Sequence, residues 1–380
     1  MGMKEVFIIG DNIVSPVGLT SLENFNRLTQ LTSGIRIHEN KLMAAEPFYA
    51  SLFGDDEFPG DPQQEGYSRF EQMLLRSVSD ALMLSGLDPE DKKLIFILST
   101  TKGNISLLET GCAELINKKR LSLPESAATI ASYFRFHHTP LVVSHACISG
   151  MVAAITGLRL IRSGLYDHAV VAGADEISRF ILSGFQSFQA VSPVPCKPFD
   201  AKRNGITLGE AAGTLILSSS RKKNGPAIKF EGGSVSNDAN HISGPSRTGM
   251  ELCDTIQKTM KEAGVRAGQI DFISAHGTAT VYNDEMEARA LTLAGLQEIP
   301  LNSLKGYYGH TLGAAGLIES IVSIHTLRES VLLPTFGFHE PGTTKPIHVV
   351  NKLQKGSFRR FLKTGSGFGG CNASMLLSRE

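Results

Sequence analysis

Three side chains in this sequence have both the type and the setting for covalent chemistry, and the first of them is Cys147. It lies between an apolar run that ends at His145-Ala146 and a long apolar segment that begins near Gly150. A cysteine at the start of a helix meets unpaired N–H groups and the positive end of the helix dipole, and both lower a thiol pKa. Position alone leaves two interpretations open, a nucleophile or a small buried hydrophobic residue.

The other two side chains are histidines on glycine-rich segments. His276 follows a short apolar run in Ser-Ala-His-Gly-Thr, and His310 precedes an apolar helix in Tyr-Gly-His-Thr. Loops at the ends of strands are where α/β proteins place chemistry, and an imidazole can donate a hydrogen bond or transfer a proton. Each histidine alone also fits a structural role.

The remaining cysteines and histidines point away from metal or disulfide chemistry. Five cysteines at wide spacing, with no CxxC pair, argue against a disulfide framework or a zinc ribbon and favour a reducing compartment. We expect four of them to be packing residues: Cys112, Cys196, Cys253 and Cys371. No carboxylate joins His137, His138 and His145 at ligand spacing, so we expect no metal.

A glycine-rich stretch near the end of the sequence, Gly365 to Gly370, formally satisfies GxGxxG. Only ten residues follow it, which leaves no room for the helix, strand and acidic residue of a dinucleotide-binding unit. We expect this loop instead to bring a backbone N–H close to a reacting carbonyl group.

Composition sets the outer limits. The 380 residues suggest two domains or one large double unit at roughly 150 residues per domain, and 42% hydrophobic residues suffice for a large core. Lysine plus arginine and aspartate plus glutamate both number 37, a balance that argues against general nucleic-acid binding. No apolar run reaches the ~18 residues of a membrane span, and no signal peptide is apparent, so we expect a cytoplasmic protein.

The elements that must position these residues occur twice along the chain. Buried-type strands alternate with helices in the first half, which predicts a βαβ unit and a parallel sheet over 94–98, 140–144, 150–163 and 169–172. The second half repeats strand and helix patterns over 270–275, 283–293, 301–303 and 310–327. An overlay at an offset of 163 residues places Gly150 on Gly313 and predicts a duplication with its junction near 218–226.

Six motifs in a fixed order carry a family resemblance. The chain resembles the β-ketoacyl-acyl carrier protein synthases, in particular the elongating branch with one cysteine and two histidines, in these segments: Val6–Gly10 with Ser15–Gly18, Ala146-Cys147, Pro198–Gly213, His276–Thr280 with Asn283, Asp284 and Glu287, Lys305–Gly316, and Gly367–Gly370 with Asn372.

The resemblance implies an α/β thiolase-like fold with duplicated halves in five layers, α-β-α-β-α. The halves would be residues 1–222, with the cysteine, and 223–380, with both histidines. It implies a homodimer, leaves a heterodimer with a related subunit open, and names an acyl carrier protein bearing acyl and malonyl thioesters as the partner. It implies no cofactor.

The same resemblance assigns the roles. Cys147 would take the acyl chain, and His276 and His310 would bind the malonyl thioester carbonyl and hold the enolate that forms on decarboxylation. Lys305 would position the two histidines. The backbone N–H groups of Cys147 and Phe368 would form an oxyanion hole, which typically contributes roughly 10²–10³ in rate per donor.

Other residues would support this centre. Ser366 and Gly367 would belong to the gating loop beside Phe368, and Glu210 would order the surrounding network without reacting.

Two residues depart from the family pattern: His145 stands where the family usually has a small residue or threonine, and Ser366 where it usually has phenylalanine. With the turn at 99–103, these departures touch the acyl pocket and the gating loop and not the reacting groups. The space at Ser366 would either be open to the acyl chain or be filled by His145 or Tyr308. The departures predict intact condensing chemistry with altered substrate preference, as in a polyketide or polyene pathway.

Two other function classes fit the same chain. One is a non-catalytic partner resembling the chain-length factors, which lack the nucleophile; the other is a cysteine acyltransferase or hydrolase without condensation.

The carrier protein that the resemblance names is acidic, whereas this chain has no net charge. We therefore expect a local basic patch where the carrier docks, either Lys202 with Arg203 or the run Lys118 to Arg120.

Overall fold

The computed structural model describes residues 4–54, 58, 64–109, 117–222 and 225–380. Its strands are β1 (Phe7–Val14), β2 (Arg36–His38), β3 (Phe48–Ser51), β4 (Leu94–Ser99), β5 (Leu141–Val143), β6 (His168–Asp175), β7 (Leu208–Gly209), β8 (Ala211–Ser218), β9 (Ile228–Asn237), β10 (Phe272–Ser274), β11 (Leu301–Asn302), β12 (Val331–Leu332), β13 (Gln354–Lys355), β14 (Arg360–Gly367) and β15 (Cys371–Arg379). Its α-helices are α1 (Ser21–Thr29), α2 (Arg69–Ser85), α3 (Leu123–Tyr133), α4 (Ser149–Arg162), α5 (Arg179–Ser187), α6 (Met250–Ala263), α7 (Val281–Leu293), α8 (Lys305–Tyr308) and α9 (Ala315–Glu329).

The predicted duplication is visible in the order of the strands. From the centre outward, the first half runs β1-β8-β6-β4-β5 and the second runs β9-β15-β14-β10-β11. In chain order, each series places its first strand at the centre, then its fifth, fourth, second and third. The directions agree as well, since β4 pairs in parallel with β6 and β5, and β10 pairs in parallel with β14 and β11. The two series join where Phe7 of β1 pairs with Lys229 of β9.

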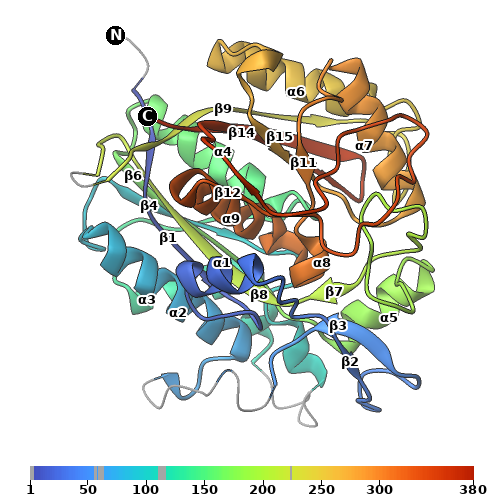
Figure 1. Ribbon diagram of the computed structural model, residues 1–380. Helices are drawn as coiled ribbons and strands as arrows, with labels where there is room; N and C mark the ends of the chain where they lie inside the picture. Colours follow the sequence, from blue (N-terminus) through green and yellow to red (C-terminus); the bar gives the residue numbers. More distant parts are fainter. Residues whose placement is uncertain (1–3, 55–57, 59–63, 110–116, 223–224) are drawn as a thin grey trace.

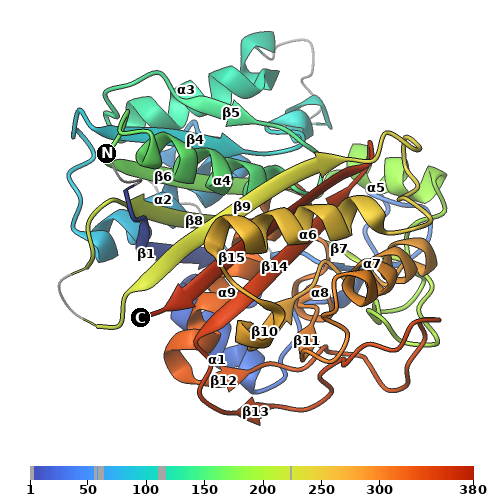
Figure 2. The ribbon, with the colours of Figure 1, turned by 90° about the horizontal axis from the view of Figure 1, so that it is seen from above.

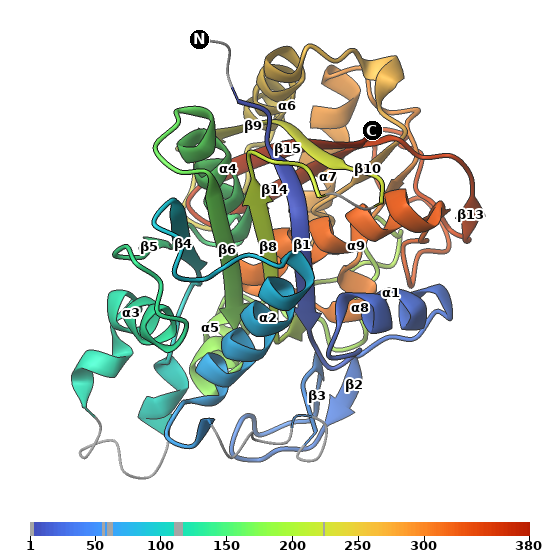
Figure 3. The ribbon, with the colours of Figure 1, turned by 90° about the vertical axis from the view of Figure 1, so that its left-hand side faces the viewer.

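The layers follow from this order. Figure 1 shows α4 and α9 between the two halves of the sheet, and both helices contact strands of both halves. Figure 2 shows α6 and α7 over the outer face of the second half, and Figure 3 shows α2 across β1 and β8 on the outer face of the first. The arrangement is the expected thiolase-like fold, five layers deep.

Two glycines allow the central helices to touch. A Cβ on Gly150 would lie 3.0 Å from the carbonyl oxygen of Gly313, and a Cβ on Gly316 would lie 2.4 Å from Cγ of Met151. Only glycine permits backbones to approach this closely. The overlay of Gly150 on Gly313 therefore identified the place where the two halves meet.

Local signals account for most of the predicted helix ends. Helix α2 begins with a capping box between Ser68 and Glu71 and ends at Gly86 in the left-handed conformation, which a Ser-Gly ending favours. The strand at 270–275 is shorter than predicted, and α9 begins after a 3₁₀ turn at Leu312–Ala314, later than expected.

Two predictions touch residues outside the described part of the chain. Cys112 lies there, and the proposed division after residue 222 falls beside residues 223–224, which also lie there. Within the described residues, no helix combines the length and the apolar character needed to cross a membrane.

Candidate active site

A sharp turn between β5 and α4 presents Cys147. Ala146 has a φ of 46°, a conformation that is costly for a residue with a side chain. Ser149 stabilises the turn, because its Oγ donates to the carbonyl oxygen of Ala146 at 2.6 Å and accepts from the N–H of His145 at 2.8 Å. The sulfur is therefore held next to the N-terminus of helix α4, as predicted.

His276 is positioned by carboxylates of helix α7. The N–H groups of His276 and Gly277 donate to the two carboxylate oxygens of Glu287, each at 2.8 Å. Gly277 has a φ of 41°, and a Cβ there would lie 2.6 Å from Cβ of Ser303. The glycine after the histidine is thus required by the close approach of a neighbouring segment.

His310 is held by the first half of the chain. Its N–H donates to the carbonyl oxygen of Thr207 at 2.7 Å. The preceding Gly309 has a φ of 68°, and a Cβ there would lie 2.4 Å from the carbonyl oxygen of Leu208. Contacts with the segment before β7 therefore direct the histidine towards the cysteine.

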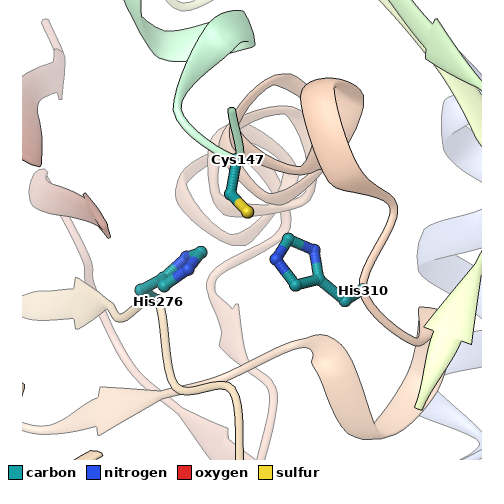
Figure 4. Close-up of side chains that lie close together, drawn as sticks. All are labelled: Cys147, His276 and His310. Atoms are coloured by element: carbon teal, nitrogen blue, oxygen red, sulfur yellow. The ribbon is translucent and has the colours of Figure 1, made fainter. Parts of the chain in front are cut away.

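The three predicted side chains meet in one place. The Cys147 sulfur and one nitrogen from each of His276 and His310 all lie within 4.8 Å of one another. The two rings are nearly perpendicular, with centroids 5.4 Å apart, and Figure 4 shows both turned towards the sulfur. They line a cavity of about 680 Å³. This donor set would also suit a soft metal ion, so the expectation of no metal stays a prediction.

Hydrogen bonds assign the same tautomer to both histidines. Nδ1 of His310 accepts from the N–H of Leu312 at 3.2 Å, and Nδ1 of His276 lies 3.3 Å from the Lys305 ammonium, which can only donate. A neutral imidazole whose Nδ1 accepts carries its proton on Nε2. Both histidines therefore offer an Nε2–H donor on the side away from these partners.

Both imidazoles are neutral at physiological pH. Burial, and after it the positive charge of Lys305, hold the pKa of His276 and of His310 well below the ordinary value. Lys305 is itself buried, and its ammonium donates to the carbonyl oxygen of His276 at 2.6 Å and to Glu319 at 2.6 Å. The predicted positioning residue is thus in direct contact with one histidine.

The expectation of a lowered thiol pKa at Cys147 is wrong for this structure. Burial raises the pKa of the Cys147 thiol to about 11, which outweighs the lowering by Lys305 and by the N–H of Phe368 beside the sulfur. The sequence shows that a helix begins here, but the thiolate also loses its water when the loop of Phe368 and the two histidines surround it.

This difference has a measurable consequence. With a raised pKa, the thiolate fraction is small at neutral pH and grows about tenfold per pH unit, so alkylation of Cys147 by iodoacetamide should accelerate steadily from about pH 7 to pH 10. Mass spectrometry of the peptide that contains Cys147 measures the rate. A plateau near pH 8 would instead indicate that the helix start dominates.

The predicted gating loop closes over the sulfur. A Cβ on Gly367 would lie 3.0 Å from the backbone nitrogen of Cys147, so glycine lets the loop reach the cysteine. The ring of Phe368 packs against Phe185 and Phe188, with centroids 5.6 and 5.7 Å away. These two partners were not predicted from the sequence, because only the fold brings α5 beside the loop.

Ser366 lines the same cavity. Its Oγ donates to Oδ1 of Asn372 at 2.7 Å, so the hydroxyl proton is already engaged. Neither His145 nor Tyr308 lines the cavity, and Tyr308 lies in the hydrophobic core. Neither residue therefore borders the cavity beside Ser366, and open space at this position stays a prediction.

Glu210 lies outside the cavity. It is buried, accepts from the N–H of Phe53 at 2.9 Å, and pairs with Arg69 at 2.6 Å. Burial raises the pKa of its carboxyl group to about 7. These contacts agree with the expected ordering role.

One of the two expected basic patches is only partly available at the surface, because Lys202 is exposed whereas Arg203 is buried. Arg203 is 8% exposed, and its guanidinium donates to the carbonyl oxygens of Asp200 and Gly342 and pairs with Glu285. Lys118 and Lys119 are exposed, whereas Arg120 pairs with the buried Glu71 at 2.6 Å. Arg203 therefore holds loops together and cannot present a free charge.

Sequence reasoning missed three buried charged residues around the site. Glu319 bridges Lys305 and a second buried lysine, Lys363, whose Nζ lies 2.7 Å from Glu319. Asp175 accepts from the N–H of Gly313 at 2.7 Å and from the hydroxyl of Thr100 at 2.9 Å, which joins the start of α9 to the first half. Two signals in the sequence could have indicated them: Lys363 lies inside a strand, and Glu319 lies inside an apolar helix.

Family models match both halves of the chain. The beta-ketoacyl synthase N-terminal domain matches residues 3–223, and the beta-ketoacyl synthase C-terminal domain matches residues 229–339. A 3-oxoacyl-[acyl-carrier-protein] synthase 2 of Rhizobium meliloti is 36% identical over 422 residues, covering 99% of both chains. A protein of the same name from Vibrio cholerae is 29% identical, covering 100% of both.

Solved structures agree with these matches. A ketosynthase in complex with its chain length factor from Xenorhabdus doucetiae superimposes with a TM-score of 0.89 at 26% identity, covering 99% of this chain and 98% of that one. Since one family model alone spans more than half of the chain and the Rhizobium relative is matched over nearly its whole length, the chain belongs to the β-ketoacyl synthase family.

Proposed function

We propose that Cys147 receives the acyl group and that His276 and His310 activate the second substrate in a decarboxylative Claisen condensation. The chain is a condensing acyltransferase of fatty-acid or polyketide biosynthesis. The observation that carries the assignment of residues is the meeting of one sulfur and two imidazole nitrogens within 4.8 Å.

The first stage is a thioester exchange. The sulfur of Cys147 bonds to the acyl carbonyl carbon, the bond from that carbon to the carrier's thiol breaks, and the proton of Cys147 ends on the departing thiol. No proton is lost overall, which suits a thiol whose pKa burial has raised. The N–H groups of Cys147 and Phe368 would bind the oxyanion of the tetrahedral intermediate.

The second stage uses the two histidines as donors. Their Nε2–H groups would converge on the thioester carbonyl oxygen of malonyl, so that the electron pair released with carbon dioxide rests as an enolate on that oxygen. The enolate carbon then attacks the acyl carbon on Cys147, the bond from that carbon to sulfur breaks, and the thiolate released takes up one proton from water to regenerate the thiol. Lys305 would act as a positioning residue that keeps both imidazoles neutral.

Two other functions make different demands on the site. A chain-length-factor-like partner needs no nucleophile, and here a cysteine faces two neutral imidazoles. A hydrolase or simple acyltransferase needs one base and an orienting group, not two donors that meet at one carbonyl. The site geometry therefore favours condensation.

One incubation separates the three functions. The protein is mixed with an acyl thioester and a malonyl thioester of an acyl carrier protein, and products are identified by mass spectrometry. Condensation yields a carrier-bound 3-oxoacyl chain two carbons longer. Free acid would indicate hydrolysis, and unchanged substrates would indicate a non-catalytic subunit.

Ser366 should shape substrate preference. A phenylalanine ring can bury about 150–250 Å², and its absence leaves room beside the acyl-cysteine for rigid or unsaturated chains. We expect Ser366→Phe to lower kcat/KM for a conjugated acyl substrate by about 10-fold, or ~1.4 kcal/mol, and to spare a short saturated one. Ser366→Ala, which keeps the space, should behave like the natural protein. Equal losses on both substrates would mean that the loop was only damaged.

The proposal extends to the assembly. Residues 1–222 would supply the nucleophile and residues 223–380 the two donors, so each half contributes to one centre. The edge strand β5 exposes Leu141 and has a free side in the described residues, which supports pairing with a second copy as a homodimer. A heterodimer with a related subunit is the alternative, and the cytoplasmic location stays a prediction.

A further inference from the structure

A shallow depression lies beside the entrance to the cysteine cavity. It has a volume of about 310 Å³ and shares Val281, Tyr282 and Arg247 with that entrance. Its apolar part is unusually open, since Tyr282 is 78% exposed and Val281 51% exposed. An exposed aromatic side chain next to an active-site entrance is a frequent feature of protein contact surfaces.

Two arginines give this depression a positive rim. The guanidinium of Arg289 donates to the backbone carbonyl oxygen of Arg247 at 2.7 Å, which holds the two residues side by side. In the described part of the chain neither guanidinium has an ion pair with a carboxylate. The one carboxylate of the lining, Glu285, already pairs with the buried Arg203 and accepts from Thr344, so its charge is compensated.

We infer that this depression, lined by Arg247, Val281, Tyr282 and Arg289, is where the acidic carrier protein docks to deliver its thioester. The inference rests on the proposed function. A carrier surface with carboxylates around an apolar side chain would complement the apolar floor and the two unpaired arginines of this depression. The chain as a whole has no net charge, so attraction of an acidic carrier requires such a local positive surface. The shared residues place the docked carrier where its flexible arm enters the cavity.

The alternative basic sets are less suitable. Arg203 is buried and engaged with loop carbonyls, and Arg120 is paired with Glu71. Lys118, Lys119 and Lys202 are exposed, but none of them lines the cysteine cavity or the depression beside it. Arg247 and Arg289 are the cations that border the entrance depression, and Arg289 does not line the cysteine cavity itself. Arg289 is therefore the position at which docking can be tested with the least effect on chemistry.

The test compares extender substrates on enzyme that has already been acylated from acyl-pantetheine. Wild type, Arg289→Glu, Arg247→Ala and Tyr282→Ala are assayed with malonyl-acyl carrier protein, malonyl-phosphopantetheine and malonyl-pantetheine. For Arg289→Glu, the loss of kcat/KM should be about 10-fold greater on the carrier than on malonyl-pantetheine. The wild-type rate with the carrier should fall with added salt, and this dependence should flatten in the variant.

The exposed Arg266, which lies outside the depression, supplies the matched control. Arg266→Glu should keep the wild-type rate and salt dependence with the carrier. Equal losses of Arg289→Glu on all three substrates, or no loss on the carrier, would overturn the docking site. A loss on phosphopantetheine as large as on the carrier would assign the arginines to the phosphate of the arm and not to the protein. Wild type that condenses none of the three malonyl thioesters would instead contradict the proposed function.

Discussion

Replacing Cys147 by serine should abolish formation of the acyl-enzyme, with a loss of roughly 10³-fold or more. The two imidazoles near the sulfur carry their protons on Nε2, and their Nδ1 atoms are occupied, so neither is placed to accept a proton from a hydroxyl. A serine would thus lack the general base that makes serine a nucleophile elsewhere. Intact mass after incubation with an acyl carrier thioester measures the acyl group directly.

A second cysteine beside the site provides the control. Cys371 begins β15, and its thiol lies 3.4 Å from the carbonyl oxygen of Phe368 on the loop that covers the site. Cys371→Ser should retain acylation, because its sulfur is buried against the backbone. Acylation that persists in Cys147→Ser and disappears in Cys371→Ser would transfer the nucleophilic role to Cys371.

Removing either histidine should separate the two stages of the reaction. His276→Ala and His310→Ala each delete one Nε2–H donor from the place where the enolate oxygen would lie, which should lower condensation by roughly 10²–10³-fold. Acylation of Cys147 should continue, because that stage uses backbone N–H groups and exchanges one thiol proton for another. Release of carbon dioxide from the malonyl thioester and intact mass of the enzyme follow the two stages independently.

A histidine away from the site tests whether the effect is specific. His138 is half-buried, its ring bonds to the carbonyl oxygen of Lys92, and it does not line the cysteine cavity, so His138→Ala should change neither stage. Loss of acylation with normal condensation on enzyme acylated by other means would show that the histidines serve the first stage. Our division of roles would then be wrong.

The sequence predicts the parts of the site that local rules govern. Cys147 after a strand and before a helix, and histidines beside glycines that close contacts demand, follow from element boundaries and backbone geometry. Motif order added Lys305 and Phe368, which the structure places beside His276 and Cys147. These features depend on a few neighbouring residues, so they can be predicted without knowing the fold.

Features that depend on distant contacts were missed. The Glu319 bridge between Lys305 and Lys363 joins helices α8 and α9 to strand β14, so it depends on how three separate elements pack. The raised pKa of the Cys147 thiol and the burial of Arg203 arise from everything packed around them, and a residue type alone does not report its exposure. Arg203, which the sequence suggested as a surface charge, is therefore buried and holds loops together, whereas its neighbour Lys202 is exposed.

The contact between Gly150 and Gly313 links catalysis to the integrity of the whole molecule. The nucleophile precedes one central helix and His310 precedes the other, so neither half of the chain holds a complete set of reacting groups. Slippage of these helices by the length of a single methyl group would separate sulfur from imidazole before any secondary structure is lost. Enzymatic activity therefore depends on how the two halves are aligned. On heating, activity should be lost at a lower temperature than the helical signal in circular dichroism, because a shift between the halves is enough to separate the reacting groups.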